Sequence, residues 1–391
     1  MPVPLPRPGE EKLTRPTAEE TAFNARAVAT ASAPPTGLTD LQRLLLEALF
    51  HAMTDHPVDL RGYEPVSAVE YAESLRWRTL GFRDRTVQLM LLSALILRPL
   101  PTEVTARIGE YAGALGVTDG LIDVARGFAS GSLGLAAVDF ERNGYTSSWH
   151  ADDAHALHTS RELQAAWDVA VADPALAAQW HRLESLPDGT LGQGVARLYR
   201  ARGFTYPGTP GSAPPLLAQH DWVHVLADYG TTVESELEVF GFIARANDDM
   251  RAFSLLAMVI SLFETGYLRT GAGLFESSTG HLSANHGVAV RLADAMRRGA
   301  LCTDTTVGVG AQADSVDFLR LDWFELADLA IDDVRARFHV TPKRSDAVAA
   351  GSVSPWESGG ISPFQVAQGR AVAADEGREY DSFGASPPPD G

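Results

Sequence analysis

The segment QHDWVHVLADYGTTVESELE, residues 219–238, holds two histidines and several carboxylates around one glycine. If residues 217–228 form a helix, His220 and His224 lie four residues apart. Their side chains are then about 40 degrees apart around the helix axis and roughly 6 Å apart along it. Asp221 lies on the neighbouring part of the same surface. This spacing places two imidazoles and one carboxylate within reach of a single divalent ion.

A second carboxylate joins this group only if the chain turns back. Glu236 would lie about 18 Å beyond His224 on a straight helix, too far to share an ion. Gly230 is a natural helix terminator, and Thr231 to Glu234 has the S/T-x-x-E form of a capping box for a new helix. We therefore expect Glu236 to face His220 and His224, with Glu234 as the capping residue. Glu238 is expected to be solvated.

Two imidazoles with one or two carboxylates suit zinc, and they also suit the two-histidine, one-carboxylate arrangement that iron uses. Histidine pairs with this spacing also occur without a metal, on protein surfaces or hydrogen-bonded in a core. The metalloprotease pattern H-E-x-x-H needs glutamate where this chain has Asp221. An HD-type phosphohydrolase needs further ligands that nothing in the sequence marks. A metal-dependent hydrolase is therefore the weaker alternative.

Outward from this segment, helical patterns dominate and no run of alternating strand pattern occurs. Thr39 or Asp40 can cap a helix over LQRLLLEALFHAM, and Asp84 can begin an apolar helix that includes residues 87–97. A Pro-Thr-Glu start at residues 101–103 precedes a helix that should turn at Gly116. Another capped helix is expected to follow Thr118. The sequence predicts an all-α fold.

We expect two helical domains between disordered tails. Polar and small residues at 146–160 suggest the boundary, which gives a first domain at 37–148 and a second at 160–342. The tails at 1–36 and 343–391 are rich in residues such as Pro, Ala, Ser and Gly, and they are predicted to be disordered.

Composition narrows the function classes. A net charge of -18, with two lysines against thirty arginines, argues against nucleic acid as a partner. The same charge disfavours an anionic membrane surface unless an apolar patch compensates, so membrane contact is at most peripheral. The apolar runs at 87–97 and 254–263 are shorter than a bilayer-spanning helix. No secretory signal is evident and Cys302 is the only cysteine, which favours a reducing cytoplasm and excludes a thiolate cluster.

The motif residues also resemble a known family. His220, Asp221 and His224, followed after eleven residues by Glu236, are similar to the H-D-x-x-H-(x)11-E signature of coenzyme Q biosynthesis protein four, the ubiquinone-biosynthesis Coq-four family. The segment WHRLESLPDGTLGQGVARLYRARGF (180–204) resembles the family's L-P-x-G-(S/T)-L-G segment. The segment LDWFELADLAIDDVRARFHV (321–340) resembles its closing segment. The resemblance covers residues 173–342. Residues 60–145 look weakly like a TerB-type helical domain.

The resemblance implies an all-helical protein that binds zinc, or a similar divalent ion such as iron, through His220, Asp221, His224 and Glu236. It also implies an isoprenoid or quinone-like lipid as ligand and other biosynthetic enzymes as partners. The family is linked to removal of the quinone head-group carboxylate with hydroxylation at the same carbon. The apolar stretch 254–263 is a candidate wall for the lipid tail, and plain core is its alternative reading.

Two hypotheses of different class follow. The first is a metal-dependent enzyme of quinone biosynthesis that acts on a lipidic aromatic precursor. The second is a non-catalytic lipid-binding scaffold in which the metal only ties two helices together. Both place the protein in the cytoplasm, with contact at the membrane surface as a further option.

Overall fold

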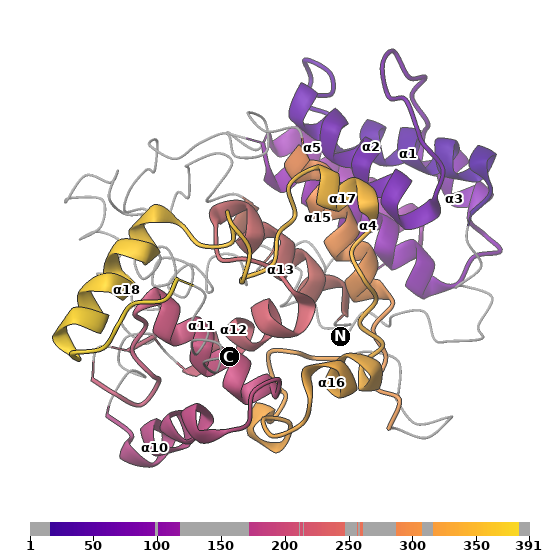
Figure 1. Cartoon of the computed structure of the whole chain (residues 1–391). Helices are drawn as coiled ribbons and strands as arrows, with labels where there is room; N and C mark the ends of the chain where they lie inside the picture. The colour runs from indigo at the N-terminus through magenta and orange to yellow at the C-terminus, as the bar shows by residue number, and fades with distance from the viewer. Residues whose placement is uncertain are drawn as a thin grey trace.

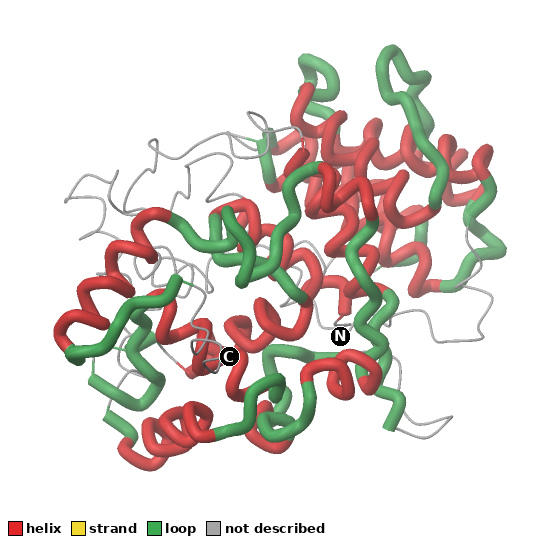
Figure 2. Tube along the Cα trace, viewed as in Figure 1, coloured by secondary structure: helices red, strands yellow, loops and turns green. Residues whose placement is uncertain are grey.

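A computed structural model of the chain describes residues 16–97, 101–117, 172–210, 212–213, 215–246, 256, 259–260, 287–306 and 316–382. Within these ranges the regular structure is helical, as Figure 2 shows. The β-type pairing found there is one isolated bridge between Thr190 and Ala330. The predicted all-α fold is confirmed for this part of the chain.

The N-terminal helices form one bundle, drawn in indigo and purple in Figure 1. Their bounds are α1 Ala18–Ser32, α2 Asp40–Thr54, α3 Ala68–Ser74, α4 Leu80–Leu95 and α5 Thr102–Ala114.

Local sequence explains where several of these helices begin. Thr39 caps α2 as predicted, in a reciprocal capping box with Gln42. The helix expected to begin at Asp84 begins earlier, at Leu80, because the hydroxyl of Thr79 accepts a hydrogen bond from the backbone N–H of Phe82. The expected turn at Gly116 is present, with φ of 70°. The helix expected after Thr118 lies outside the described residues.

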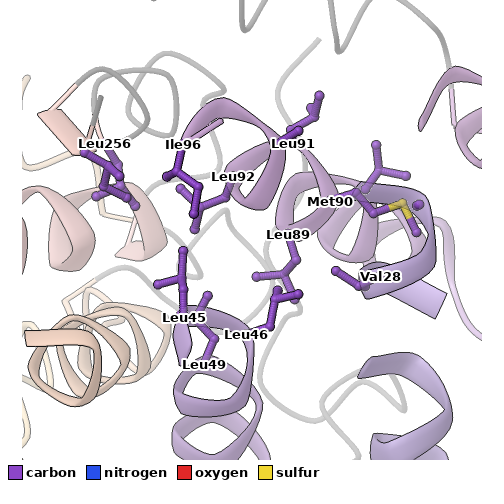
Figure 3. Packing of buried hydrophobic residues seen from close by; sticks show 14 of the residues in the cluster. Val28, Leu45, Leu46, Leu49, Leu89, Met90, Leu91, Leu92, Ile96 and Leu256 are labelled. Carbon is purple, nitrogen blue, oxygen red and sulfur yellow. The ribbon is translucent and has the colours of Figure 1, made fainter. Parts of the chain in front are cut away.

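A large apolar cluster holds the bundle together. Figure 3 shows Leu45 and Leu46 of α2 pointing toward Leu89 and Leu92 of α4. All four side chains are buried. The cluster continues into residues from the second half of the chain, which are Ala213, Leu217, Val233, Leu237, Phe240, Ala244, Leu256, Val259, Ile260, Val288, Ala289, Leu292, Ala293 and Met296. One apolar core therefore contains residues from both of the expected domains.

The second half of the chain supplies the remaining elements. Their bounds are α10 Pro174–Arg182, η3 Leu183–Ser185, α11 Leu191–Arg202, α12 Pro215–Ala227, α13 Val233–Ala246, α15 Gly287–Ala300, η4 Trp323–Glu325, α16 Ile331–Arg337, α17 Ser345–Ala349 and α18 Pro363–Asp375. They surround a second apolar cluster that is rich in aromatic rings. In it Trp222 of α12 stacks on Trp323, with ring centroids 5.7 Å apart.

Helix α13 lies between the two clusters. Its Leu237 and Phe240 belong to the first cluster, and its Val239 and Phe242 belong to the second. Helix α15 packs on both α13 and α2, and Figure 1 shows it beside the N-terminal bundle. These two helices therefore connect the bundle to the part of the molecule that carries the histidine motif. The expected boundary at 146–160 lies outside the described residues.

Helices lie within both predicted tails, so the expectation of disorder is wrong for residues 16–36 and 343–382. Residues 1–15 and 383–391 lie outside the described residues. Helix α1 buries an alanine-rich face that includes Ala25 and Ala29. Alanine has the highest helix propensity and permits close packing, although it gives a weak amphipathic pattern. Helix α18 has a proline at its start and a capping box from Ser362 to Gln365. The segment that precedes α18 packs against the histidine motif, as described below.

No described helix has the length and apolar character needed to cross a membrane. Of the candidate lipid-tail wall at 254–263, the described residues are Leu256, Val259 and Ile260, and all three are buried in the first cluster. The rest of that segment lies outside the described residues.

Candidate metal centre

Helix α12 brings the first three motif residues to one point. His220, Asp221 and His224 are all buried, and one ligand atom from each lies within 4.8 Å of the other two. The two imidazole rings have centroids 5.3 Å apart. The i, i+4 spacing on a helix produces this pairing, as predicted.

The chain turns back between α12 and α13, but not in the way that was expected. Asp228, with φ of 65°, takes the left-handed position that ends α12, and the N–H of Tyr229 donates to the carbonyl of His224. Gly230 has no positive φ. A Cβ atom on Gly230 would lie 2.7 Å from the Cα of Gly360, so glycine is needed there for close approach of two backbones.

The cap of α13 also differs from the prediction by one residue. The hydroxyl of Thr232 accepts a hydrogen bond from the N–H of Ser235 at 3.4 Å, and α13 begins at Val233. Thr231 and Glu234 therefore do not form the expected capping box. The Thr231 hydroxyl instead donates to the side chain of Gln365, at 2.8 Å.

The turn brings Glu236 to the histidines, as predicted. Its Oε2 lies 3.5 Å from the Nε2 of His220 and 3.3 Å from the Nε2 of His224. The Oδ1 of Asp221 lies 3.6 Å from the Nε2 of His220. Ligand atoms at zinc distances in a tetrahedron are about 3.3 Å apart. His220, Asp221 and His224 could therefore hold a small divalent ion, and Glu236 faces the Nε2 atoms of both histidines.

Backbone carbonyls orient both imidazoles. The Nδ1 of His220 contacts the carbonyl of Leu217, and the Nδ1 of His224 lies 2.7 Å from the carbonyl of Gly230 and 3.3 Å from that of Tyr229. A carbonyl oxygen only accepts hydrogen bonds, so Nδ1 carries the proton in each neutral ring. In this tautomer the Nε2 of each ring keeps its lone pair, which faces Glu236. A metal-binding imidazole nitrogen needs such a lone pair.

The centre has more buried polar atoms than hydrogen bonds to satisfy them. Both carboxylate oxygens of Glu236 and the Nε2 of His224 are buried and make no hydrogen bond among the described residues. A buried polar group without a partner costs about 1–3 kcal/mol, and a charged group costs more. Burial raises the pKa of Glu236, but His224 and His220, when they are protonated, outweigh it through their charge and hydrogen bonds and hold that pKa well below its usual range. A divalent cation would supply the missing contacts of these atoms.

Tyr199 of α11 is a site residue that the sequence analysis missed. Its hydroxyl donates to the Oδ2 of Asp221 at 2.5 Å, while the other oxygen of Asp221 faces His220. The Tyr199 ring is buried against Trp180 and Tyr206. It lies in the segment 180–204 that resembles the Coq-four family, but nothing in that pattern pointed to Asp221.

The prediction for Glu238 is wrong. This side chain is buried rather than solvated, and its Oε2 lies 2.6 Å from the guanidinium of Arg291 on α15. Arg291 also donates to the hydroxyl of Ser235. Because Glu236 and Glu238 are two residues apart on a helix, they face different neighbours. Glu238 joins α13 to α15 and Glu236 joins α13 to α12.

The end of α12 is anchored by arginines from two other helices. Arg298 of α15 donates to the carbonyl of Ala227 at 2.9 Å, and Arg335 of α16 donates to the carbonyl of Leu226 at 2.9 Å. These side chains satisfy carbonyls that a helix end leaves unpaired, and they complement the negative end of the helix dipole. The helix that carries both histidines is therefore held by α15 and α16.

The two segments that flank the motif meet beside it. The backbone N–H of Leu191 donates to the carbonyl of Leu329, and that of Gly192 donates to the carbonyl of Ala327. A Cβ on Gly192 would lie 2.9 Å from the Cβ of Ala327, so only glycine permits this approach. The segments 180–204 and 321–340 are therefore neighbours in space.

Comparison with known family models, with curated proteins and with solved structures gives no match to this chain.

Proposed function

We propose that this protein binds one divalent transition-metal ion through His220, Asp221, His224 and Glu236, and acts as a metal-dependent protein of the Coq-four type. The observation that supports the proposal most strongly is the buried group of His220, Asp221 and His224, whose ligand atoms lie within 4.8 Å of one another. The Oε2 of Glu236, from a second helix, lies 3.5 Å and 3.3 Å from the Nε2 atoms of His220 and His224. A solvated polar helix face would not bury four ionisable side chains together.

The ligand chemistry favours zinc, with ferrous iron as the alternative. Neutral imidazole with carboxylate suits both ions, whereas calcium and magnesium prefer sites made of oxygen alone. Cys302 is buried in the second apolar cluster, and its pKa is raised by burial to about 12, so it is not a metal-binding thiolate.

The proposed substrate is a quinone precursor or related lipidic aromatic compound that carries an isoprenoid tail. The resemblance of the motif and its two flanking segments supports this assignment. A bound divalent ion would act there as a Lewis acid that stabilises negative charge on a carboxylate or phenolate oxygen. The chain itself contributes the orientation of both imidazoles by backbone carbonyls and of Asp221 by Tyr199. Other enzymes of the same biosynthesis are the proposed partners.

A second candidate is a lipid-binding scaffold in which the metal has a structural role. The complete burial of the four side chains favours it, because structural zinc sites are closed by four protein ligands, whereas catalytic sites keep one position open. In this case the ion would tie α12 to α13 and so stabilise the fold.

Metal analysis of the purified protein tests the proposed site. We expect about one zinc or iron ion per chain, and loss of most of that metal in His220→Ala and in His224→Ala. His181→Ala is the matched control, because His181 is an exposed histidine on α10 that pairs with Glu184. Equal metal content in the wild type and in the double variant His220→Ala, His224→Ala would refute the proposal.

Two further measurements separate the candidates. A catalytic role predicts that ligand substitutions abolish turnover of a quinone precursor while the melting temperature and lipid binding change little. A structural role predicts that melting temperature and function fall together. Mass spectrometry of the lipid extracted from purified protein should find an isoprenoid, whose head group would identify the substrate. A protein that carries no isoprenoid would contradict both candidates.

A further inference from the structure

The segment that precedes α18 contacts the turn between α12 and α13 through its backbone. The N–H of Gly230 donates to the carbonyl of Val353 at 3.0 Å, and the N–H of Thr231 donates to the carbonyl of Gly360 at 2.8 Å. We call residues 352–362 the C-terminal loop. This loop is far from the histidine motif in sequence and lies directly against it in space.

Two adjacent peptide groups of the turn each link this loop to His224. The first joins Tyr229 to Gly230: its N–H points to Val353, and its carbonyl lies 3.3 Å from the Nδ1 of His224. The second joins Gly230 to Thr231: its N–H points to Gly360, and its carbonyl lies 2.7 Å from the same Nδ1. Because a peptide group is planar and trans, fixing its N–H fixes the direction of its carbonyl.

Buried side chains hold Thr231, the residue that follows the second peptide group, and the carbonyl of Gly360, to which that group donates. The side chain of Gln365 accepts from the Thr231 hydroxyl at 2.8 Å and donates to the Thr231 carbonyl at 3.0 Å. The guanidinium of Arg202 donates to the Thr231 hydroxyl at 2.6 Å and to the Gly360 carbonyl at 3.1 Å. Gln365 and Arg202 are both fully buried. A connected network of this kind fixes one geometry more firmly than a single bond would.

Glycine at both contact positions makes the approach possible. A Cβ on Gly230 would lie 2.8 Å from the carbonyl oxygen of Gly360, and a Cβ on Gly360 would lie 2.0 Å from the carbonyl oxygen of Ser354. Neither Gly230 nor Gly360 has a positive φ. Glycine is therefore required at these positions by the close contact between backbones and not by backbone strain.

We infer that the C-terminal loop and Gln365 are positioning elements of the metal centre: they hold the Gly230 carbonyl so that His224 presents its Nε2 to the ion. The inference rests on the proposed metal site and adds to it a part of the chain that supplies no ligand. Outer-shell partners of metal-bound histidines commonly contribute 10–100-fold to metal affinity.

Two substitutions test this role without touching a ligand. Gly230→Ala pushes the turn away from Gly360. Gln365→Met removes both hydrogen bonds to Thr231 at similar side-chain volume, together with the capping contact that the Gln365 side chain accepts from the N–H of Ser362. Gln368→Met is the matched control, because Gln368 lies on the same helix and donates to Gly203 instead. Zinc affinity, measured by competition with a chelator, should fall about 10–100-fold in the first two variants and stay unchanged in the control. The visible spectrum of the cobalt-loaded protein should change in the same two variants.

A second readout works without metal. In the metal-free protein, nitrogen-15 NMR of labelled histidine should show His224 protonated at Nδ1, and Gln365→Met should give a mixture of tautomers with circular dichroism unchanged. Wild-type affinity, cobalt spectrum and tautomer in both variants would overturn the inference. If the wild type binds no metal while the tautomer shifts as expected, the proposed function fails together with the role toward an ion, and only the orientation of His224 by the C-terminal loop and Gln365 stands.

Discussion

At the scale of single residues, the centre depends on a tyrosine that is not a candidate ligand. The Tyr199 hydroxyl holds one oxygen of Asp221, so the other oxygen is directed toward His220. A short hydrogen bond to a carboxylate is stronger than one between neutral groups. Tyr199 therefore limits the rotation of Asp221 in the same way that backbone carbonyls limit the rotation of the two imidazoles.

We expect Tyr199→Phe to weaken zinc binding about tenfold and to lower the free energy of unfolding of the metal-free protein by about 1–3 kcal/mol, since the buried Asp221 loses this hydrogen bond. Chelator competition and urea unfolding measure the two effects. Tyr206→Phe removes a hydroxyl from a ring stacked on Tyr199 and should leave zinc affinity unchanged. A Tyr199→Phe protein with wild-type zinc affinity would show that Asp221 needs no positioning.

The grouping of His220, Asp221 and His224 could be predicted because it is local to one helix, whereas Glu236 reaches it from α13 through a turn whose form was not predicted. Four residues along a helix place His220 beside His224 whatever surrounds them. Tyr199 and Glu238 could not be assigned, because their partners, Asp221 and Arg291, lie on other helices. The glutamate at 238 sits in a polar stretch of sequence, and only the packing of α15 on α13 makes its position a buried one.

At the scale of elements, α13 and α15 cross with little space between their backbones. A Cβ on Gly299 of α15 would lie 2.1 Å from the carbonyl oxygen of Phe242 on α13. At the same interface, a Cβ on Gly241 would lie 2.6 Å from the side chain of Leu292. The buried pair of Glu238 with Arg291 spans the same interface. Glycine sets the distance between these helices, and that distance brings the two charged groups together.

We expect Gly299→Ala to lower the free energy of unfolding by about 1–3 kcal/mol, because the added methyl group must separate two packed helices. Gly113→Ala is the control: Gly113 lies within α5 with nothing near its Cβ position, so alanine should stabilise the protein by about 0.5–1 kcal/mol. Thermal and urea unfolding of both variants measure these values. Equal stability of Gly299→Ala and the wild type would mean that the helices separate at no cost.

The predicted start of a helix was confirmed where a capping residue lies directly before it, as at Thr39 before α2. At α4 the start predicted at Asp84 was wrong, because the helix begins at Leu80 and is capped by Thr79. The helices α1 and α18 were missed because their alanine-rich sequences have weak apolar periodicity. Their order comes from burial against other elements, which composition does not reveal.

At the scale of the whole molecule, the N-terminal bundle covers apolar faces of α13 and α15, the helices that pack beside the candidate metal centre. The buried residues Leu45 and Leu49 of α2 share one cluster with Val288, Leu292 and Met296 of α15. Without the bundle, these side chains of α15 would be exposed to water. The same helix carries Arg291 and Arg298, which hold α13 and α12. The stability of the candidate metal centre is thus coupled to the bundle through α15.

We therefore expect a fragment of residues 160–391, made without the bundle, to lose cooperative thermal unfolding and to bind a dye that reports exposed apolar surface, because burial of apolar area is the main stabilising contribution to a fold. Its zinc affinity should fall with its structure. Addition of a separately made fragment of residues 1–159 should restore both properties, since it returns the partner surface of α15. The full-length chain should unfold in a single transition followed by near-ultraviolet circular dichroism. The 160–391 fragment could alone give the near-ultraviolet circular dichroism spectrum and the zinc affinity of the full-length chain. That result would show that the candidate metal centre is stable without the bundle.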